Sequence, residues 1–218
     1  MTGTAGMSET VLYDYWRSSA SYRVRIALNS LGESYRSVPV DLLAKAHKGP
    51  EHLARNPQGL VPVLEIDGER FTQSLAIIEY LAETRSHAGF LPTDPIGRQR
   101  VRMLSYAIAM DIHPTCNLGV VSYVMANAED GEAARRNWMR KFIGEGLAAF
   151  ERLLDHSATG RFCHGDSPTM VDFCLVPQVY NARRWEVDLS ACPRLVAIDQ
   201  NCAEIEAFAR AHPDRTAR

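Results

Sequence analysis

Two adjacent serines, Ser18 and Ser19, stand between a short apolar run and a helical pattern. The first turn of a helix has backbone N–H groups without intrahelical partners and carries a partial positive charge. A thiol bound there would be favoured as its thiolate, because the anion gains those donors. A serine hydroxyl would add one more donor. Taken alone, however, the pair favours an ordinary helix N-cap over a thiol site.

Two other features could complete a site for a small peptide. Pro62 opens an apolar run, and a cis Val61–Pro62 bond there would expose the Val61 N–H and C=O to an extended peptide that adds to the sheet edge. Gln73 and Ser74 begin another helical pattern, which suits a carboxylate. Each feature is weak alone, but together with Ser18 they describe a thiol slot, a backbone slot and a carboxylate slot.

The elements that must position these residues alternate in the order β-α-β-α-β-β-α. Apolar residues at helical spacing predict a helix that begins near Ser21 and ends at Gly32, and Ser74 is expected to cap the last helix. Asp67-Gly68 indicates a hairpin. The expected strands cover residues 11–15, 34–42, 60–67 and 70–72. This order predicts a thioredoxin-like domain over residues 9–86, with helices on both faces of a mixed sheet.

The second half of the chain is helical in pattern. A linker is expected over residues 86–94, and a long helical stretch follows over 96–156 with Asp130-Gly131 as its only strong break. Thr169 and Asp172 have the spacing of a capping box at the start of a further helix. The sequence therefore predicts an all-α domain over residues 95–213, so that the fold class is α/β followed by all-α.

Composition narrows the kind of protein. The chain has 218 residues with a formal net charge of −2, which gives no reason to expect a nucleic acid or an acidic membrane as partner. Its 5 cysteines are odd in number and form no C-x-x-C pair, so reduced thiols are expected rather than a metal site or disulfides. No apolar stretch is long enough to span a membrane, and residues 1–8 resemble a disordered lead rather than a signal peptide. These features predict a cytoplasmic protein.

Five segments, in order from about residue 11 to about residue 213, resemble the zeta-class glutathione transferases, the family of the maleylacetoacetate isomerases: YDYWRSSASYRVRIAL, NPQGLVPVLEIDG, TQSLAIIEYL, DIHP and VPQVYNARRWEVDL. The resemblance implies the glutathione transferase fold, glutathione as cofactor and a homodimer. Many members of this class have cysteine where this chain has Ala20. The reactive thiol must therefore come from glutathione alone.

The resemblance also assigns the peptide site. Ser18 would hold and activate the glutathione thiol, with Ser19 and Arg17 as further catalytic candidates. Val61 would pair with the cysteinyl backbone beside Pro62. Gln73 and Ser74 would hold the γ-glutamyl end.

A second set of residues is expected at the substrate. A dicarboxylate requires cations, and Arg17 and Arg184 match positions that the family uses near its substrate. His113, Cys116 and Asn117 would line the pocket, with His113 and Asn117 also counted as cofactor contacts and Cys116 as a substrate contact.

The activity implied by the resemblance is the glutathione-dependent cis–trans isomerisation of maleylacetoacetate to fumarylacetoacetate in tyrosine and phenylalanine breakdown. Maleylpyruvate isomerisation is the nearest alternative, but its relatives carry arginine shortly after DIHP, where this chain has Leu118-Gly119. Conjugation or dehalogenation of small electrophiles such as α-haloacids is another alternative. A glutathione-transferase-like interaction module is disfavoured, because Ser18, Pro62 and the Gln73-Ser74 pair are all present.

Overall fold

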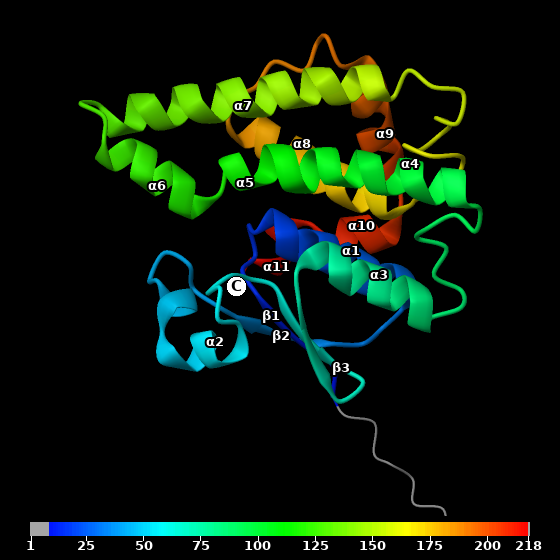
Figure 1. Cartoon of the computed structure of the whole chain (residues 1–218), viewed down its shortest axis with the longest axis horizontal. Helices are drawn as coiled ribbons and strands as arrows, with labels where there is room; N and C mark the ends of the chain where they lie inside the picture. The colour runs from blue at the N-terminus through cyan, green and yellow to red at the C-terminus, as the bar shows by residue number, and fades with distance from the viewer. Residues whose placement is uncertain (1–8, 218) are drawn as a thin grey trace, which may run out of the picture. The chain divides into compact units, whose positions relative to one another are not determined.

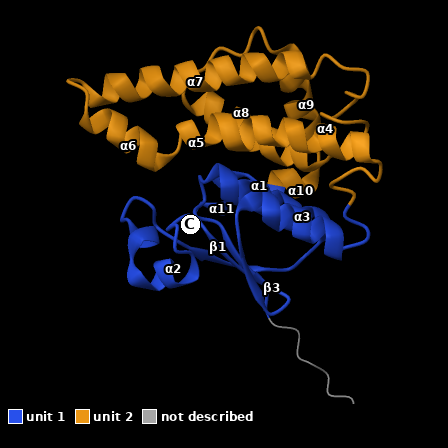
Figure 2. Cartoon of the chain, in the orientation of Figure 1, with its two compact units in different colours: residues 1–88, 210–218 blue, residues 89–209 orange. Residues whose placement is uncertain are grey.

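The computed structural model describes residues 9–217, and the expected disordered lead at 1–8 lies outside them (Figure 1). The chain divides into unit 1, residues 1–88 with 210–218, and unit 2, residues 89–209 (Figure 2). The boundaries expected from sequence were 9–86 and 95–213. The division differs at the C-terminal end because Arg25 Nε of unit 1 donates a hydrogen bond to the Ala211 C=O at 3.1 Å, so this segment belongs with unit 1.

Unit 1 contains a mixed four-stranded sheet in the order β2-β1-β3-β4. β1 is parallel to β2 and antiparallel to β3, and β3 is antiparallel to β4. Asp67 and Gly68 both have positive φ, 56° and 82°, as the predicted two-residue hairpin requires. The strands are β1 Val11–Asp14, β2 Arg36–Pro39, β3 Val63–Ile66 and β4 Glu69–Thr72. The sheet confirms the thioredoxin-like prediction.

The helices of unit 1 begin and end at recognisable signals. α1 starts two residues before the expected Ser21 because Ser18 is its N-cap, and Gly32 ends it with a φ of 69°. α1 and α3 lie side by side against the strands (Figure 1). The helical elements are α1 Ser19–Leu31, the 3₁₀ turn η1 Ala46–Lys48, α2 Pro50–Arg55, α3 Ser74–Thr84 and α11 Pro213–Thr216.

Unit 2 is all-α, as predicted, with α8 packed against α4, α7 and α9. Asp130 caps α7 at the expected break. The prediction of a single strong break was wrong, because a second one falls at Cys116, and Asn117 caps the next helix by accepting from Val120 N–H at 3.1 Å. The elements are α4 Pro95–Tyr106, the π-helix η2 Ala107–Ile112, α5 His113–Thr115, α6 Leu118–Ala126, α7 Gly131–Leu153, α8 Met170–Arg184 and α9 Pro193–Ala203. α10 Glu206–Ala211 begins in unit 2 and ends in the C-terminal segment of unit 1.

The start of α8 shows the predicted capping box in full. Asp172 is fully buried and accepts from the Thr169 N–H at 2.7 Å and from the Cys163 N–H at 2.9 Å. Burial raises the pKa of Asp172, and the hydrogen bonds from Cys163 and Thr169 oppose that rise. The carboxylate thus joins the loop at Cys163 to the first turn of α8.

Replacing this carboxylate should destabilise the protein. Asp172→Ala removes a cap and leaves two buried N–H donors without an acceptor, which should lower the free energy of unfolding by about 2–4 kcal/mol. Asp130→Ala, at the exposed cap of α7, should cost only about 0.5–1 kcal/mol. Urea unfolding followed by circular dichroism measures both. Equal losses in the two variants would contradict a special role for the buried box.

Candidate active site

Ser18 is the N-cap of α1. Its Oγ accepts a hydrogen bond from the Ser21 N–H at 3.2 Å, so the ordinary cap interpretation is correct as far as it goes. A hydroxyl that accepts one bond still has its own proton to donate. Ser18 can therefore cap the helix and donate to an anion at the same time. Ser19 is the first residue of α1, so its N–H belongs to the first turn, whose N–H groups have no partner within the helix.

The chain reaches Ser18 through a tight turn. The Ser18 N–H donates to the Tyr15 C=O at 2.8 Å, so that Trp16 and Arg17 form the middle of the turn. The Arg17 guanidinium lies 4.6 Å from the centroid of the Trp16 ring and donates to the Tyr15 hydroxyl at 3.2 Å. Arg17 is half-buried. A cation is thus held directly before the cap residue by a stacking contact and a hydrogen bond.

The Val61–Pro62 peptide bond is cis. Within residues 9–217, neither the N–H nor the C=O of Val61 bonds to another backbone group. The sequence pattern predicts Val61 at an edge of the sheet. In the structure, Val61 precedes β3, which lies between β1 and β4 and is therefore an inner strand. An extended peptide can still pair with these two backbone groups ahead of β3.

Side chains from the segment before β3 hold the neighbouring peptide. The Leu60 C=O accepts from Asn56 Nδ2 at 2.9 Å, and His52 Nε2 lies 2.9 Å from the same oxygen. Lys48 Nζ donates to the carbonyls of Gln58 and Gly59 at 3.2 and 3.1 Å. This loop, residues 56–61, is therefore fixed by side chains where regular structure is absent, and it presents Val61 in a defined orientation.

Gln73 and Ser74 start α3, but their roles differ from expectation. Gln73, not Ser74, is the N-cap, with a φ of 67°, and its Nε2 donates to Gln58 Oε1 at 2.8 Å. Ser74 is buried, and its Oγ accepts from Arg23 Nη1 at 3.3 Å. Ser74 is not the cap, because it is the first residue within α3. A buried arginine beside this helix start adds positive charge that favours a carboxylate.

Hydrogen bonds thus connect the three slots within unit 1. Arg23 of α1 reaches Ser74, and Gln73 reaches Gln58 in the loop that carries Val61. The arrangement fits glutathione in three respects: a hydroxyl proton at a helix start for a thiolate, an unpaired peptide group for its backbone, and a positive helix start for a carboxylate.

Three of the substrate candidates of unit 2 lie at the break between α5 and α6, whereas Arg184 lies at the end of α8. His113 is the first residue of α5, Cys116 follows that helix, and Asn117 caps α6. Burial raises the pKa of the Cys116 thiol, with the nearby Thr115 hydroxyl opposing, so Cys116 is a protonated thiol at neutral pH. Arg184 is exposed at the end of α8, where its Nη1 lies 3.5 Å from Asn181 Oδ1.

Tryptophan side chains pack beside α5 and next to Arg184. Trp138 of α7 donates from Nε1 to the Thr115 C=O at 2.8 Å and so holds the end of α5. Trp185, directly after Arg184, lies beneath the Arg135 guanidinium, 4.8 Å from ring centroid to Cζ. Both tryptophans are half-buried.

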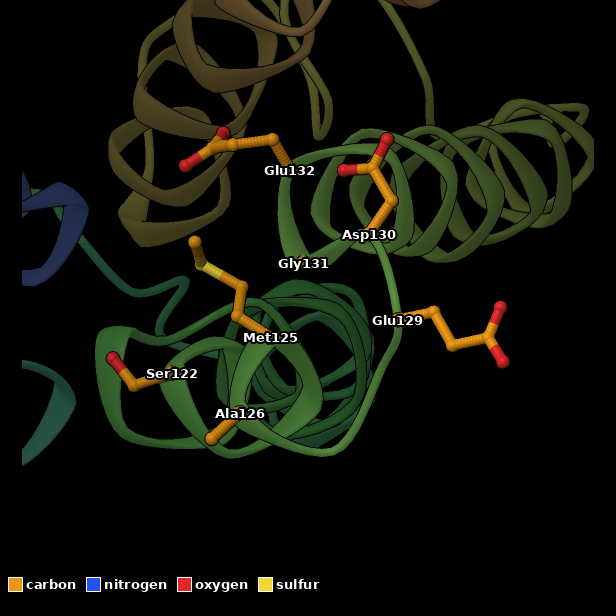
Figure 3. A pocket seen from close by; sticks show the side chains of 7 residues that line it. All are labelled: Ser122, Met125, Ala126, Glu129, Asp130, Gly131 and Glu132. Carbon is orange, nitrogen blue, oxygen red and sulfur yellow. The ribbon is translucent and has the colours of Figure 1, made fainter.

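A hollow of about 610 Å³ between α6 and α7 does not contain the candidate residues. Figure 3 shows Met125 and Glu132 extending to one side of the turn there, whereas Glu129 points away. Three acidic residues, Glu129, Asp130 and Glu132, line this hollow. Their charge disfavours a dicarboxylate, so we exclude it as the substrate site.

Sequence reasoning missed Arg23, His52 and Asn56. Asn56 gave a local signal, since Asn-Pro marks a turn, and its side chain holds that turn by accepting from the Gln58 N–H at 3.1 Å. Arg23 and His52 gave none, because their partners are separated from them by 51 and 8 residues.

Among the described residues, no three His, Cys, Asp or Glu side chains lie together as a metal site. None of the helices in 9–217 has the length and apolar character to cross a membrane.

Comparison with known proteins identifies the family of this chain. Residues 8–83 match the N-terminal domain of glutathione S-transferase, and residues 132–200 match a C-terminal domain of glutathione S-transferase. A maleylacetoacetate isomerase of Rhizobium meliloti (strain 1021) is 82% identical over 208 residues, covering 95% of this chain and 98% of that protein.

Two solved structures are similar throughout. The holo structure of a bacterial zeta-class maleylpyruvate isomerase has a TM-score of 0.91 at 42% identity, covering 95% of this chain and 98% of that one. A maleylacetoacetate isomerase from Methylobacterium extorquens AM1 with bound malonate and glutathione has a TM-score of 0.91 at 39% identity, covering 94% and 97%. The chain therefore belongs to the glutathione S-transferase family and, within it, to the zeta class.

Proposed function

We propose that the protein is a glutathione-dependent isomerase that converts maleylacetoacetate to fumarylacetoacetate. The observation that carries the proposal is Ser18, whose Oγ is occupied as an acceptor by the Ser21 N–H while its own proton remains available at the start of α1. The 82% identical relative supports the choice of substrate. The neighbour with bound malonate and glutathione supports a dicarboxylate beside this cofactor.

Glutathione supplies a thiol that adds reversibly to the conjugated double bond, so that the former double bond can rotate. A free thiol with a pKa near ~8.5 is only a few per cent ionised at neutral pH. Lowering that pKa by about two units requires roughly 2.7 kcal/mol of preferential stabilisation of the anion. The Ser18 hydroxyl and the first-turn N–H groups of α1, including that of Ser19, are the source we assign to it.

The remaining residues of unit 1 orient the cofactor. The Val61 N–H and C=O, beside Pro62, pair with its cysteinyl backbone, and the loop held through Leu60 keeps them in place. Gln73 and Ser74 hold the γ-glutamyl end at the start of α3, near the charge of Arg23. Fixing the tripeptide at its γ-glutamyl end and its cysteinyl backbone places its thiol at Ser18 and reduces the entropy lost at the transition state.

Cations at the substrate serve a dicarboxylate. Arg17 is held beside Ser18 by Trp16, and Arg184 stands at the end of α8. Each can bind a carboxylate, and Arg17 can also stabilise negative charge that develops on the substrate near the thiol. His113, Cys116 and Asn117 are assigned to the pocket wall, with the protonated Cys116 acting by shape and not as a nucleophile. Asn117 is limited as a cofactor contact, since its Oδ1 already caps α6.

Maleylpyruvate isomerisation is the second candidate. The TM-score of 0.91 to a maleylpyruvate isomerase equals that to the maleylacetoacetate isomerase with bound malonate and glutathione, so similarity of fold supports both candidates. Both substrates are cis-configured dicarboxylates that use the same first step, so the site of unit 1 does not distinguish them. The identity of 82% to a maleylacetoacetate isomerase against 42% to that structure favours maleylacetoacetate.

The proposal includes a homodimer in the cytoplasm that acts in tyrosine and phenylalanine breakdown. Ile96, Met103 and Met110 are 82%, 37% and 57% exposed and recur every seventh residue, which places them on one face of α4 and η2. Such an apolar stripe supports a second copy of the chain as its cover. The cysteines of the described residues are free thiols, as suits a reducing compartment.

Ser18 can be tested apart from its role as a cap. Ser18→Ala should lower kcat by about 100- to 1,000-fold, because a donor to the thiolate is lost. Ser18→Asp keeps the cap acceptor but removes the donor, so it should fold as well as the parent and remain inactive. Initial rates with maleylacetoacetate and the thiolate absorbance of bound glutathione give the readout. Ser30→Ala, near the other end of α1, is the matched control. Near-normal turnover of Ser18→Ala would reduce Ser18 to a helix cap.

The substrate assignment has a direct measurement. Turnover of maleylacetoacetate and maleylpyruvate, compared side by side, should give a higher kcat/KM for maleylacetoacetate. Arg184→Gln should raise the KM for either dicarboxylate about tenfold, since a charge-assisted bond is lost. Arg183→Gln is the control, because Arg183 pairs with Asp199 at 2.7 Å and is not assigned to the substrate. A clear preference for maleylpyruvate would overturn the choice of substrate.

The apolar stripe makes the dimer testable. Met103→Glu places a charge in the middle of the stripe and should convert the dimer to a monomer in light scattering coupled to size exclusion. Leu153→Glu introduces the same charge at a position that is also exposed, 40%, but lies on α7 outside the stripe, and should leave the dimer intact. A parent chain that is monomeric, or a Met103→Glu dimer, would refute this interface.

A further inference from the structure

Arg25 lies in the middle of α1, and its side chain is only 1% exposed. It is one of the largest fully buried side chains of the chain. A buried guanidinium is costly unless its donors are satisfied, so its partners show what the fold uses it for. Two of those partners, Asp14 and Trp16, are close neighbours in sequence, and the third, Ala211, is 186 residues from Arg25.

The first partner is Asp14, at the end of β1. Arg25 Nη1 lies 2.8 and 2.7 Å from the two carboxylate oxygens, and the Asp14 side chain is 4% exposed. The second partner is the Trp16 C=O, which accepts from Nη2 at 2.9 Å. The third is the Ala211 C=O, which accepts from Nε at 3.1 Å. One planar group therefore joins the end of β1, the turn after it and the C-terminal segment.

The Trp16 carbonyl belongs to the turn that delivers Ser18. That turn is closed by the Ser18 N–H on the Tyr15 C=O at 2.8 Å, and Trp16 and Arg17 are its two middle residues. Holding this carbonyl fixes the peptide plane between Trp16 and Arg17. Both the entry of the chain into the Ser18 cap and the stacking of Arg17 on the Trp16 ring depend on that plane.

The C-terminal segment has its own order at the same place. His212 caps α11, with its Nδ1 accepting from the Asp214 N–H at 3.2 Å, and its ring meets the Tyr22 ring edge-on at 6.1 Å. The Arg25 guanidinium lies 5.3 Å from the centroid of that Tyr22 ring. Residues 210–217 thus pack on α1 within unit 1 (Figure 2).

We propose that Arg25 is a positioning residue for the reaction, which acts on Ser18 through the Trp16 carbonyl. The C-terminal segment, residues 210–217, is held by the same guanidinium and belongs to the same set of contacts. The proposal rests on the function assigned to Ser18 above. Arginine is required because its flat fork reaches a carboxylate and two carbonyls at once, whereas a lysine ammonium is a single point of charge.

The test compares Arg25→Lys with Arg36→Lys. Arg36 also bonds a carboxylate, that of Glu9, but on the exposed surface of β2, so it is a matched control. Arg25→Lys should lower kcat at least tenfold and raise the pKa of bound glutathione, read from thiolate absorbance against pH, with KM for glutathione changed less than threefold. If Arg25→Lys does not fold, the neutral pair Asp14→Asn/Arg25→Gln, which leaves no buried charge, takes its place with the same expectation.

Two further readouts separate positioning from bulk stability. In a Ser18→Ala background, Arg25→Lys should change kcat less than twofold, because Arg25 acts through Ser18. Hydrogen–deuterium exchange should rise in residues 15–18 and 210–217 together in Arg25→Lys and in neither segment in Arg36→Lys. A purely structural role would lower the melting temperature but leave kcat and the thiol pKa of the folded enzyme unchanged, and that result would overturn the proposal.

The outcome also distinguishes this inference from the function on which it rests. If Ser18→Ala itself leaves the pKa of bound glutathione unchanged, the thiol site at Ser18 is refuted. If Ser18→Ala raises that pKa and Arg25→Lys does not, only the role of Arg25 is refuted. If exchange rises in one of the two segments alone, the C-terminal segment is not part of the assembly.

Discussion

The first turn of α1 contains backbone N–H groups that have no partner within the helix. The proposed thiol site of unit 1 depends on these groups. Ser18 satisfies one of them with its oxygen and keeps its own proton for a bound anion. The tight turn from Tyr15 to Ser18 sets the direction of that hydroxyl. The buried pair of Arg25 and Asp14 in turn fixes this turn, so a helix cap becomes a candidate catalytic group through its surroundings.

The other slots of the site follow the same physical rule. Backbone groups that regular structure leaves unpaired need another partner, and a bound peptide can supply it. Val61 precedes β3 with its N–H and C=O unbonded to backbone in the described chain, and the adjacent Leu60 carbonyl is held by Asn56 and His52. Gln73 adopts a positive φ at the start of α3 and is tied to Gln58. Glutathione, a peptide with a thiol and two carboxylates, has a complementary group for each position.

Unit 2 contributes a different chemistry. Its candidates are a cation at the end of α8 and a group of small polar side chains at the break between α5 and α6. Burial raises the pKa of the Cys116 thiol, which disfavours this cysteine as a nucleophile. At Ala20 in unit 1, where many members of the class have cysteine, there is no thiol either. Under the proposed function, unit 2 would supply shape and charge for an acidic substrate, and unit 1 would supply the conditions for a thiolate.

Local sequence patterns predicted the order of strands and helices in unit 1, the end of α1 at Gly32, the hairpin at Asp67-Gly68 and the capping box of Thr169 and Asp172. Each of these depends on residues a few positions apart, which a sequence displays directly. Only the tertiary structure decided that Arg23 supports Ser74 and that Arg25 joins the turn before Ser18 to the C-terminal segment. These partners are 51 and 186 residues apart, and no local pattern encodes a contact that exists only once the chain has closed on itself.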